Sequence, residues 1–510
     1  MSVILGIDLG TSSVKAMLLD SIQGVLEVES GGYDVEIPKE GYAEQEPEKW
    51  WEETKKIILR LREKNGEAFG QIAAIGFSGQ MHGIVLTDEK GTPLRPAILW
   101  LDQRSKKELE EIYQKIDLEK MGNVLRNRVY TGFGFPSLMW VREHEPEILQ
   151  KTRWIMMPKD FIRYKMTGKI ASDVTDASST AIFHTAERTW AYDMIREFGL
   201  PLEIFPPCGE SMEIAGYVTK KCAMECGLKE GIPVVYGAGD QQAQSIGNGI
   251  CEEGKIICNI GTGGQISTYI KDPIYDKKLR THTFCHSIDK GYTIYGATLC
   301  SGMSLKWLKD KILQIDDFDQ LSKMAGEIAP GSEGLIYLPY LTGERTPHMD
   351  PCAKGMFAGL TLRHERRHMV RAVMEGVTMS LRDSLTIFQE LGIKCDTIIA
   401  SGGGARSHEW LQMQADIFHK KVVVCEVSEQ ACLGACILAG SGCGIFASVK
   451  QATEQFVSFR DKVYEPDSRY EKLYDKQYER FRALYRNNRE WMVNEYGKDN
   501  SGYGYRHGGG

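Results

Sequence analysis

The chain begins with two short apolar runs separated by a turn of small residues. Residues 3–8 read VILGID, residues 9–13 read LGTSS, and residues 14–19 read VKAMLL. Two runs of this length joined by a Gly/Thr/Ser turn are typical of a β-hairpin. The same arrangement returns about half a chain later, as KIICN, IGTGG and QISTYI over residues 255–270. We therefore predict an internally duplicated protein, with two similar domains that each open on such a hairpin.

Elsewhere the apolar positions alternate between helical and strand spacing. Helical spacing covers residues 46–65, 140–151 and 364–391, and strand-like runs cover residues 72–77, 83–87, 233–237 and 397–400. Alternation of this kind is typical of α/β layers. The charged and aromatic tail from Tyr464 predicts a helix that ends near Tyr496, and residues 501–510 are expected to fray. The predicted domains are residues 1–248 and residues 249–510.

Composition describes an ordinary soluble globular protein and excludes several classes. The 510 residues are 42% hydrophobic and 26% charged, with a formal net charge of −7. Basic residues are scattered rather than gathered in a stripe, so nucleic acid is not expected as a partner. The first residues lack the pattern of a signal peptide, and no apolar run reaches the roughly 18 to 20 residues that cross a bilayer. We expect a cytoplasmic protein that does not enter the membrane.

The thirteen cysteines are spread along the chain without a Cys-x-x-Cys pair. This spacing favours reduced, buried thiols over a disulfide framework or a zinc site. The sequence does not indicate the oligomeric state, so a homodimer and a monomer both stay open as alternatives.

The two glycine-containing turns are candidate phosphate loops. Glycine and small hydroxyl residues let backbone N–H groups approach a phosphate without a side-chain clash. Thr11, Ser12 and Thr262 lie in these turns. Such turns are also common hairpin connectors, so each one alone is weak evidence. Neither turn fits the Walker pattern or the dinucleotide fingerprint, which excludes a P-loop or Rossmann domain as the nucleotide fold.

The two hairpins differ at one position where charge matters. Asp8 in the first corresponds to Asn259 in the second. Two carboxylates facing a triphosphate would repel it, whereas one can hold a Mg²⁺ ion that bridges the phosphates. The alternative is that Asp8 caps its turn by accepting backbone hydrogen bonds.

Asp240 ends an apolar strand and begins a helix. Aspartate is a favoured residue at such a position because it caps the helix, and capping lowers its pKa. In phosphoryl transfer even a weak base is sufficient, since the transition state is loose and the hydroxyl loses its proton late. Both interpretations can hold together.

Three further segments suggest ligand contact. His82 lies in SGQMHG (78–83) after a strand, where α/β sheets bind ligands, although a single histidine is more often structural. Trp100 and Asp102, with Arg104, suit a polyhydroxylated ligand, or form a salt-bridged surface turn. The SGGG of residues 401–404 would admit a flat ligand such as adenine, or would be a tight connection.

Taken together, these segments resemble the FGGY family of carbohydrate kinases, which belongs to the actin, hexokinase and Hsp70 fold superfamily. The resemblance extends from about residue 3 to residue 460 and is most specific for the xylulokinase branch. It rests on GQMHG (79–83), PKD (158–160), SDVTDAS (172–178) and LTGERTPHMDP (341–351). It implies an α/β fold of two duplicated actin-like (RNase H-like) ATPase domains flanking a central cleft that closes on substrate. It also implies transfer of the γ-phosphoryl group of ATP to a ketopentose, foremost D-xylulose, to give the 5-phosphate.

The resemblance also implies roles for individual residues. Asp240 matches the catalytic base, and Asp8 matches the acid near Mg²⁺ and the phosphates. Met81 and His82 match a sugar-contacting pair, and Asp240 with Gln241 matches the second sugar contact. The positions that match phosphate and nucleotide contacts are Thr11, Ser12, Thr262, Gly302, Lys306, Trp307, Gly404 and His408.

Some positions depart from the family pattern and leave alternatives open. Gln241 stands where many xylulokinases have Asn, and the DQQ of residues 240–242 is similar to the glycerol-kinase version. Gly263 replaces a more usual Ser, and Ser137 replaces a signature Lys. The acceptor could therefore be another ketose or polyol, such as ribulose, sedoheptulose or glycerol. Met81 and His82 favour xylulose, because glycerol kinases have an Arg-Glu pair there. A more distant alternative is an actin-like ATPase or sugar sensor that transfers no phosphate.

Overall fold

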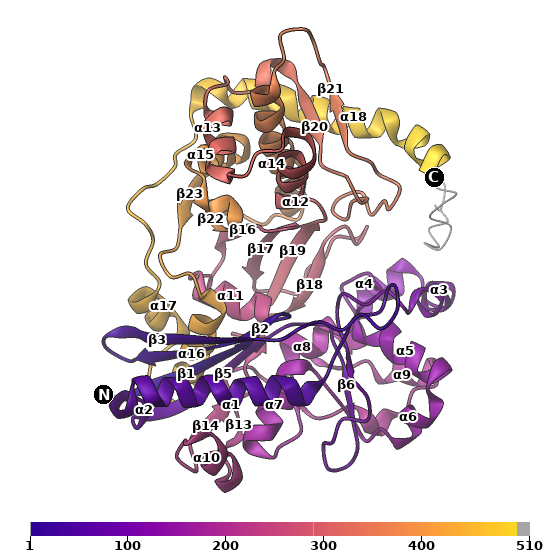
Figure 1. Ribbon diagram of the computed structural model, residues 1–510. Helices are drawn as coiled ribbons and strands as arrows, with labels where there is room; N and C mark the ends of the chain where they lie inside the picture. The colour runs from indigo at the N-terminus through magenta and orange to yellow at the C-terminus, as the bar shows by residue number, and fades with distance from the viewer. Residues whose placement is uncertain (1, 289, 497–510) are drawn as a thin grey trace.

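The computed structural model describes residues 2–288 and 290–496. Two α/β parts are stacked in Figure 1, with the indigo and magenta elements of the N-terminal part below and most orange and yellow elements of the C-terminal part above. The predicted alternation of helices and strands is confirmed. Each part is built around one large sheet.

The first sheet is organised by the predicted N-terminal hairpin. β1 (Val3–Leu9) pairs antiparallel with β2 (Ser13–Asp20), which pairs antiparallel with β3 (Gly24–Gly32). On its other side β1 pairs parallel with β5 (Ile72–Gly79), and β5 pairs parallel with β14 (Pro233–Val235). The sheet is completed by β13 (Ile214–Tyr217) at its edge and by β15 (Ala238–Gly239) beside the end of β5.

The second sheet repeats this arrangement. β16 (Gly254–Ile260) pairs antiparallel with β17 (Gly264–Ile270), which pairs antiparallel with β19 (Tyr292–Thr298). On its other side β16 pairs parallel with β22 (Cys395–Gly402), and β22 pairs parallel with β23 (Lys421–Val424). β18 (His282–Cys285) forms the outer edge. The predicted duplication is therefore confirmed by strand order and direction.

Helices and short strand pairs surround the two sheets. The helices of the N-terminal part are α1 (Pro47–Lys64), α2 (Gly66–Phe69), α3 (Lys106–Lys115), α4 (Leu118–Val124), α5 (Gly134–His144), α6 (Pro146–Lys151), α7 (Pro158–Thr167), α8 (Val174–Ser179), α9 (Tyr192–Glu197), α10 (Lys220–Cys226) and α11 (Asp240–Gly247). Those that follow are α12 (Gly302–Trp307), α13 (Phe318–Gly326), α14 (Arg366–Glu390), α15 (His408–Phe418), α16 (Gln430–Gly442), α17 (Val449–Phe456) and α18 (Glu471–Tyr496). The short pairs are β4 (Glu44–Gln45) with β7 (Ala97–Ile98), β6 (Val85–Thr87) with β8 (Trp154–Met156), β9 (Ser172–Asp173) with β12 (Cys208–Gly209), β10 (Phe183–His184) with β11 (Thr189–Trp190), and β20 (Ile336–Leu338) with β21 (Met356–Ala358).

The helix expected over residues 140–151 is two helices. α5 ends at His144 and α6 begins at Pro146. Proline lacks the backbone N–H that would continue the first helix, and it is well placed at the first turn of the next. The helical tail is confirmed as α18, and residues 501–510 lie outside the described residues.

α16 joins the two parts of the chain. It comes from the C-terminal part but lies beside β1 and β5 of the first sheet (Figure 1). A Cβ atom added to Gly76 on β5 would lie 2.1 Å from the carbonyl oxygen of Ala435, and one added to Gly434 would lie 1.9 Å from that of Ala243 on α11. Only glycine permits these backbone contacts. The tight packing holds α11, and so the chain beside Asp240, against the sheet.

The cysteines and the membrane expectation can be checked directly. All thirteen cysteines are free, in agreement with the sequence-based prediction. Within residues 2–288 and 290–496, no helix is both long and apolar enough to cross a membrane.

Candidate active site

The first candidate phosphate loop is the turn between β1 and β2, and side chains from three other segments support it. The Tyr33 hydroxyl donates to the carbonyl oxygen of Gly10 at 2.6 Å, and Gln45 Nε2 donates to that of Thr11 at 2.7 Å. Trp100 Nε1 donates to Thr11 Oγ1 at 3.0 Å. Ser12, at the tip, is exposed, and its carbonyl accepts from the Tyr33 backbone N–H. The loop is thus held in one conformation before any ligand arrives.

Trp100 therefore lies beside the first loop. Trp100 is 41% exposed, so part of its surface stays available to a ligand. Asp102 is different, because it is fully buried and accepts from the Ala43 backbone N–H at 2.7 Å. It also forms an ion pair with Arg104 at 2.8 Å, and the Arg104 guanidinium lies over the Tyr42 ring. This arrangement matches the salt-bridged alternative, and direct sugar contact by Asp102 stays a prediction.

The second candidate loop, between β16 and β17, is tied to the start of α12. The backbone N–H groups of Ser301 and Met303 donate to the carbonyl oxygen of Thr262 at 3.1 and 3.0 Å, and that of Gly302 donates to Gly261 at 2.8 Å. A Cβ atom at Gly302 would lie 2.3 Å from the Gly261 carbonyl oxygen. The loop and the helix therefore form one rigid unit that requires glycine at position 302.

A cavity of about 350 Å³ opens beside this loop. Four of the residues that the sequence assigned to the nucleotide line it: Thr262, Gly302, Lys306 and Gly404. Ile260, Gly261 and Gly403 also line it, and they belong to the IGTGG and SGGG segments that the sequence singled out. The lining residues that were missed from the sequence are Met303, Leu305, Phe318, Asp319, Ser322, Arg406, Ser407 and Trp410. Apolar walls with a few polar groups are typical of a site for a flat heterocycle. The missed residues lie on or beside α12, α13 and α15, whose approach to the loop no local motif reveals.

The remaining nucleotide candidates lie around this cavity. The Lys306 side chain is exposed and pairs with Asp310 one turn later on the helix. Trp307 follows on α12 and is half-buried, and the exposed His408 begins α15 and hydrogen bonds to the Tyr464 hydroxyl. Neither Trp307 nor His408 belongs to the cavity lining, so their contact with a nucleotide stays a prediction.

Asp8 lies near the end of β1, half-buried beside the first loop. The Ser78 hydroxyl donates to its Oδ1 at 2.7 Å. Across the described residues no backbone N–H group donates to this carboxylate, so the turn-capping alternative is wrong. Lys15 faces Asp8 in the β1–β2 ladder, but its ammonium pairs with Glu429 at 2.6 Å. Burial raises the pKa of Asp8, and the Ser78 hydrogen bond opposes this effect.

Asp240 is the first residue of α11, and Gly239 occupies the capping position before it. Burial raises the pKa of Asp240 to about 7, and the charge of Asp8 adds to this effect. Hydrogen bonds from the backbone and side chain of the half-buried Gln241 oppose it. The expected lowering of the Asp240 pKa is wrong, because desolvation and a like charge outweigh these hydrogen bonds. A carboxyl group with this pKa suits general base chemistry near neutral pH.

His82 follows β5 in a left-handed backbone conformation, with φ of 70°. Its Nδ1 lies 2.7 Å from the carbonyl oxygen of Ser179, and its ring stacks on Phe133 with centroids 4.2 Å apart. Burial lowers the pKa of His82 to about 4, so the ring is neutral at neutral pH. A carbonyl oxygen only accepts, so Nδ1 carries the proton and Nε2 is left as an acceptor.

Met81 connects the segment of His82 to β15, the strand that directly precedes Asp240. Its side chain is buried, and a Cβ atom added to Gly239 would lie 2.7 Å from Met81 Cγ. The structure thus brings Met81 next to the residue that precedes Asp240. The two segments that the sequence assigned to the sugar therefore lie side by side at the ends of β5 and β15.

Aromatic rings from the two parts of the chain meet near His82. Tyr130 and Phe133 come from the N-terminal part, while His282 and Tyr295 come from β18 and β19. The Tyr130 and His282 ring centroids are 5.6 Å apart. The Arg345 guanidinium lies 5.3 Å from the centre of the Tyr130 ring. None of these residues had a role predicted from the sequence, although Arg345 belongs to the LTGERTPHMDP motif.

Comparison with known proteins identifies the family. The model of the N-terminal domain of the FGGY family of carbohydrate kinases matches residues 3–247, and the model of its C-terminal domain matches residues 256–443. The chain belongs to the FGGY family of carbohydrate kinases. It is therefore a sugar kinase, whose substrates are ATP and a small carbohydrate.

Relatives cover nearly the whole chain. The chain is 38% identical to a xylulose kinase of Bacillus subtilis, over 90% of this chain and 91% of that protein. It is 35% identical to a xylulose kinase of Lactococcus lactis, over 96% of this chain and 98% of that protein. The crystal structure of xylulose kinase from Rhodospirillum rubrum superimposes with a TM-score of 0.91 at 28% identity, covering 96% of this chain and 99% of that one. The predicted fold, two duplicated actin-like domains, is confirmed.

Proposed function

We propose that this carbohydrate kinase transfers the γ-phosphoryl group of ATP to D-xylulose and forms D-xylulose 5-phosphate. The observation that carries the proposal is that Asp240, whose pKa is raised to about 7, and the neutral His82 follow the paired strands β15 and β5. An actin-like ATPase needs no base directed at a hydroxyl group, whereas a sugar kinase does. The relatives named above as xylulose kinases support the choice of sugar.

In this proposal Asp240 is the catalytic base. Its carboxylate orients the attacking hydroxyl group of the sugar and accepts its proton as the bond to phosphorus forms. The proton ends on Asp240, and ADP leaves with the charge of the broken bond. Gln241, through its hydrogen bonds to the carboxylate, keeps part of Asp240 ionised at neutral pH.

The sugar lies between the segments that carry Met81 and Asp240. Nε2 of His82 accepts a hydrogen bond from a sugar hydroxyl, and the half-buried Gln241 offers an amide beside the base. Trp100 presents an indole face over which a sugar carbon chain packs, and Asp102 acts by holding the turn that carries this indole. A neutral histidine suits an uncharged polyol better than an acidic sugar.

The nucleotide occupies the other side of the site. Its base and ribose fill the cavity lined by Gly302, Lys306 and Gly404, and its phosphates face the two turns that carry Thr11, Ser12 and Thr262. Trp307 and His408 flank the base from α12 and α15. Backbone N–H groups of glycine-containing turns are suited to phosphate oxygens.

Magnesium is the expected metal, and Asp8 is the residue that would hold it. The chemistry fits, because the Asp8 carboxylate lies beside the first loop and the Lys15 ammonium that faces it in the strand pair is taken up by Glu429. Hard oxygen ligands of this kind are those that Mg²⁺ prefers in kinases. When bound, the ion supplies positive charge that offsets the charge of the phosphate oxygens.

We also propose that two domains share the binding of the substrates. Residues 1–248 carry the sugar contacts and the first phosphate loop, and residues 249–510 carry the nucleotide cavity and the helical tail. Closure of the two domains would exclude water, which competes with the sugar for the phosphoryl group.

An acceptor series tests the proposal. ADP release is measured with Mg-ATP and D-xylulose, L-xylulose, D-ribulose, L-ribulose, D-fructose, sedoheptulose, glycerol or D-gluconate. We expect the highest kcat/KM with D-xylulose. A preference for another ketose or for glycerol would keep the kinase chemistry but overturn the choice of sugar. Preference for D-gluconate would likewise keep the kinase chemistry and overturn the choice of an uncharged ketose.

A further inference from the structure

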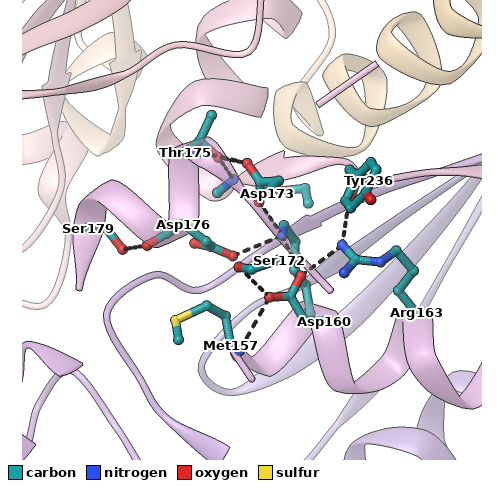
Figure 2. A network of polar contacts seen from close by, with 12 residues as sticks. Met157, Asp160, Arg163, Ser172, Asp173, Thr175, Asp176, Ser179 and Tyr236 are labelled. Carbon is teal, nitrogen blue, oxygen red and sulfur yellow. Dashed lines mark hydrogen bonds and ion pairs between the residues drawn. The ribbon is translucent and has the colours of Figure 1, made fainter. Parts of the chain in front are cut away.

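A cluster of charged residues is completely buried beneath the sugar-binding segments. Lys159 Nζ lies 2.9 Å from Asp160 Oδ1 and 3.0 Å from Asp176 Oδ2, and it also pairs with Asp173. Figure 2 shows the three carboxylates converging from α7, β9 and α8. Their oxygens are close enough together to ligate a cation. The Lys159 ammonium already fills that position, so the cluster is an ion-pair network and not a metal site.

The network contains more acids than bases. Arg163 supplies the second positive charge, 2.8 Å from Asp160, against three carboxylates. Burial raises the pKa of Asp176 well above its ordinary value, and the Lys159 ammonium opposes this effect. Asp173, which pairs with the same ammonium, is a strong hydrogen-bond acceptor that Lys159 holds in place.

From Asp173 a chain of hydrogen bonds leads to the candidate base. Asp173 Oδ2 accepts from the Thr175 backbone N–H at 2.7 Å and from the Thr175 hydroxyl (Figure 2). Thr175 Oγ1 accepts in turn from the backbone N–H of Gly239 at 2.8 Å. The direction of these hydrogen bonds is fixed, because a carboxylate only accepts. The proton of the Thr175 hydroxyl therefore points to Asp173. Gly239 is the capping residue of α11 and immediately precedes Asp240.

Thr175 lies at the start of the short helix α8, and the other end of this helix contacts His82, the proposed sugar-contacting histidine. The Ser179 carbonyl oxygen faces His82 Nδ1 at 2.7 Å, and the Ser179 hydroxyl donates to the carbonyl of Asp176 at 2.7 Å. α8 thus spans the distance between the histidine and the base. Its position is fixed by Asp173 and Asp176, which are two of the three acids that pair with Lys159.

We propose that Thr175 is a positioning residue for phosphoryl transfer, which fixes the Ala238–Gly239 peptide, next to Asp240, through the chain Lys159–Asp173–Thr175–Gly239. This inference rests on the proposed role of Asp240 as the base. Without the Thr175 hydroxyl, the Gly239 N–H loses its buried acceptor, and rotation of that peptide towards another acceptor turns the Asp240 carboxylate. Misplacement of a catalytic group by about 1 Å costs roughly a hundredfold in rate.

The test compares two substitutions that differ in the hydroxyl group. Thr175→Val keeps the shape and removes the hydroxyl, whereas Thr175→Ser keeps the hydroxyl and removes a methyl group. We expect Thr175→Val to lower kcat with D-xylulose by about 10- to 100-fold with little change in KM for ATP. Thr175→Ser should stay within about threefold of the parent. If Thr175→Val does not fold, as judged by thermal unfolding, Thr175→Ala takes its place.

A double-mutant cycle with Asp240→Asn separates positioning from general stability. If Thr175 acts through Asp240, Thr175→Val should cause no further loss of rate in the Asp240→Asn background. A full-size loss in that background, an equal loss in Thr175→Ser, or a parent-like rate in Thr175→Val would overturn the inference. A parent-like rate in Asp240→Asn alone would instead overturn the proposed function.

Discussion

Asp8 and Asp240 interact across the end of the first sheet, where burial and then the charge of Asp8 raise the pKa of Asp240 to about 7. An unperturbed aspartate has a pKa of about 3.9. The base must be deprotonated to accept a proton, so activity is present above the raised pKa and is lost below it. We therefore expect kcat/KM for the sugar to fall about tenfold per pH unit below about pH 7. A profile flat down to pH 5 would contradict this assignment.

Asp8 should control the position of that acidic limb. In Asp8→Asn the like charge is removed, so the pKa of Asp240 falls and the limb moves to lower pH. We also expect the overall rate to drop, because the proposed metal ligand is lost. The pH dependence of the remaining kcat/KM measures the shift. Asp193→Asn, which changes a fully exposed acid, is the matched control and should leave the profile unchanged.

His82 should affect the sugar and not the nucleotide. Asparagine tolerates the left-handed backbone at this position but is too short to place an acceptor where Nε2 lies. We expect His82→Asn to raise KM for D-xylulose by about ten- to a hundredfold, since a buried hydroxyl without its partner costs about 1–3 kcal/mol. Steady-state kinetics with each substrate varied in turn provide the measurement. An increase confined to KM for ATP would contradict the role given to His82.

Gly302 should affect the nucleotide and not the sugar. An added Cβ atom would lie 2.3 Å from the Gly261 carbonyl oxygen, so the second phosphate loop must move. We expect Gly302→Ala to raise KM for ATP by about tenfold, equivalent to about 1.4 kcal/mol. Gly66→Ala is the control, because no atom lies within 4 Å of a Cβ there. Equal KM values for ATP in parent and Gly302→Ala would place the phosphates elsewhere.

Lys159 should be essential for stability. Lys159→Met keeps most of the volume but leaves three buried carboxylates with Arg163 as their remaining cation. Removing one partner of a buried ion pair destabilises a protein by about 3–5 kcal/mol. Denaturant unfolding measures the loss of unfolding free energy. The control is Lys221→Met at an exposed position, for which we expect a change in unfolding free energy near zero. An unfolding free energy within error of the parent would show that the network does not stabilise the protein by this amount.

The parts of the fold that depend on local pattern were predictable from the sequence. The two hairpins have short apolar runs on either side of small-residue turns, and α14 has a long helical period, so each was predicted close to its observed bounds. The break between α5 and α6 was missed although Pro146 marks it. A proline inside a helical pattern has a local effect that hydrophobic spacing alone does not reveal.

The site was predictable where a motif carries the residue, and not where its chemistry depends on distant neighbours. His82 and Asp240 were predicted to lie at strand ends, and the structure places them after β5 and β15, while their roles stay predictions. The raised pKa of Asp240 was not, because it arises from burial and from Asp8, more than two hundred residues earlier. The rings of Tyr130 and His282 meet only because the two parts of the chain come together, and no local spacing shows that.

The most direct test of the central claim is the fate of the phosphoryl group. The protein is incubated with Mg-ATP and D-xylulose, and the products are followed by phosphorus NMR. We predict one D-xylulose 5-phosphate for each ADP, with little inorganic phosphate, and a rate about 10²- to 10⁴-fold lower in Asp240→Asn. Inorganic phosphate as the main product, formed at the same rate without sugar, would contradict the account and indicate an ATPase.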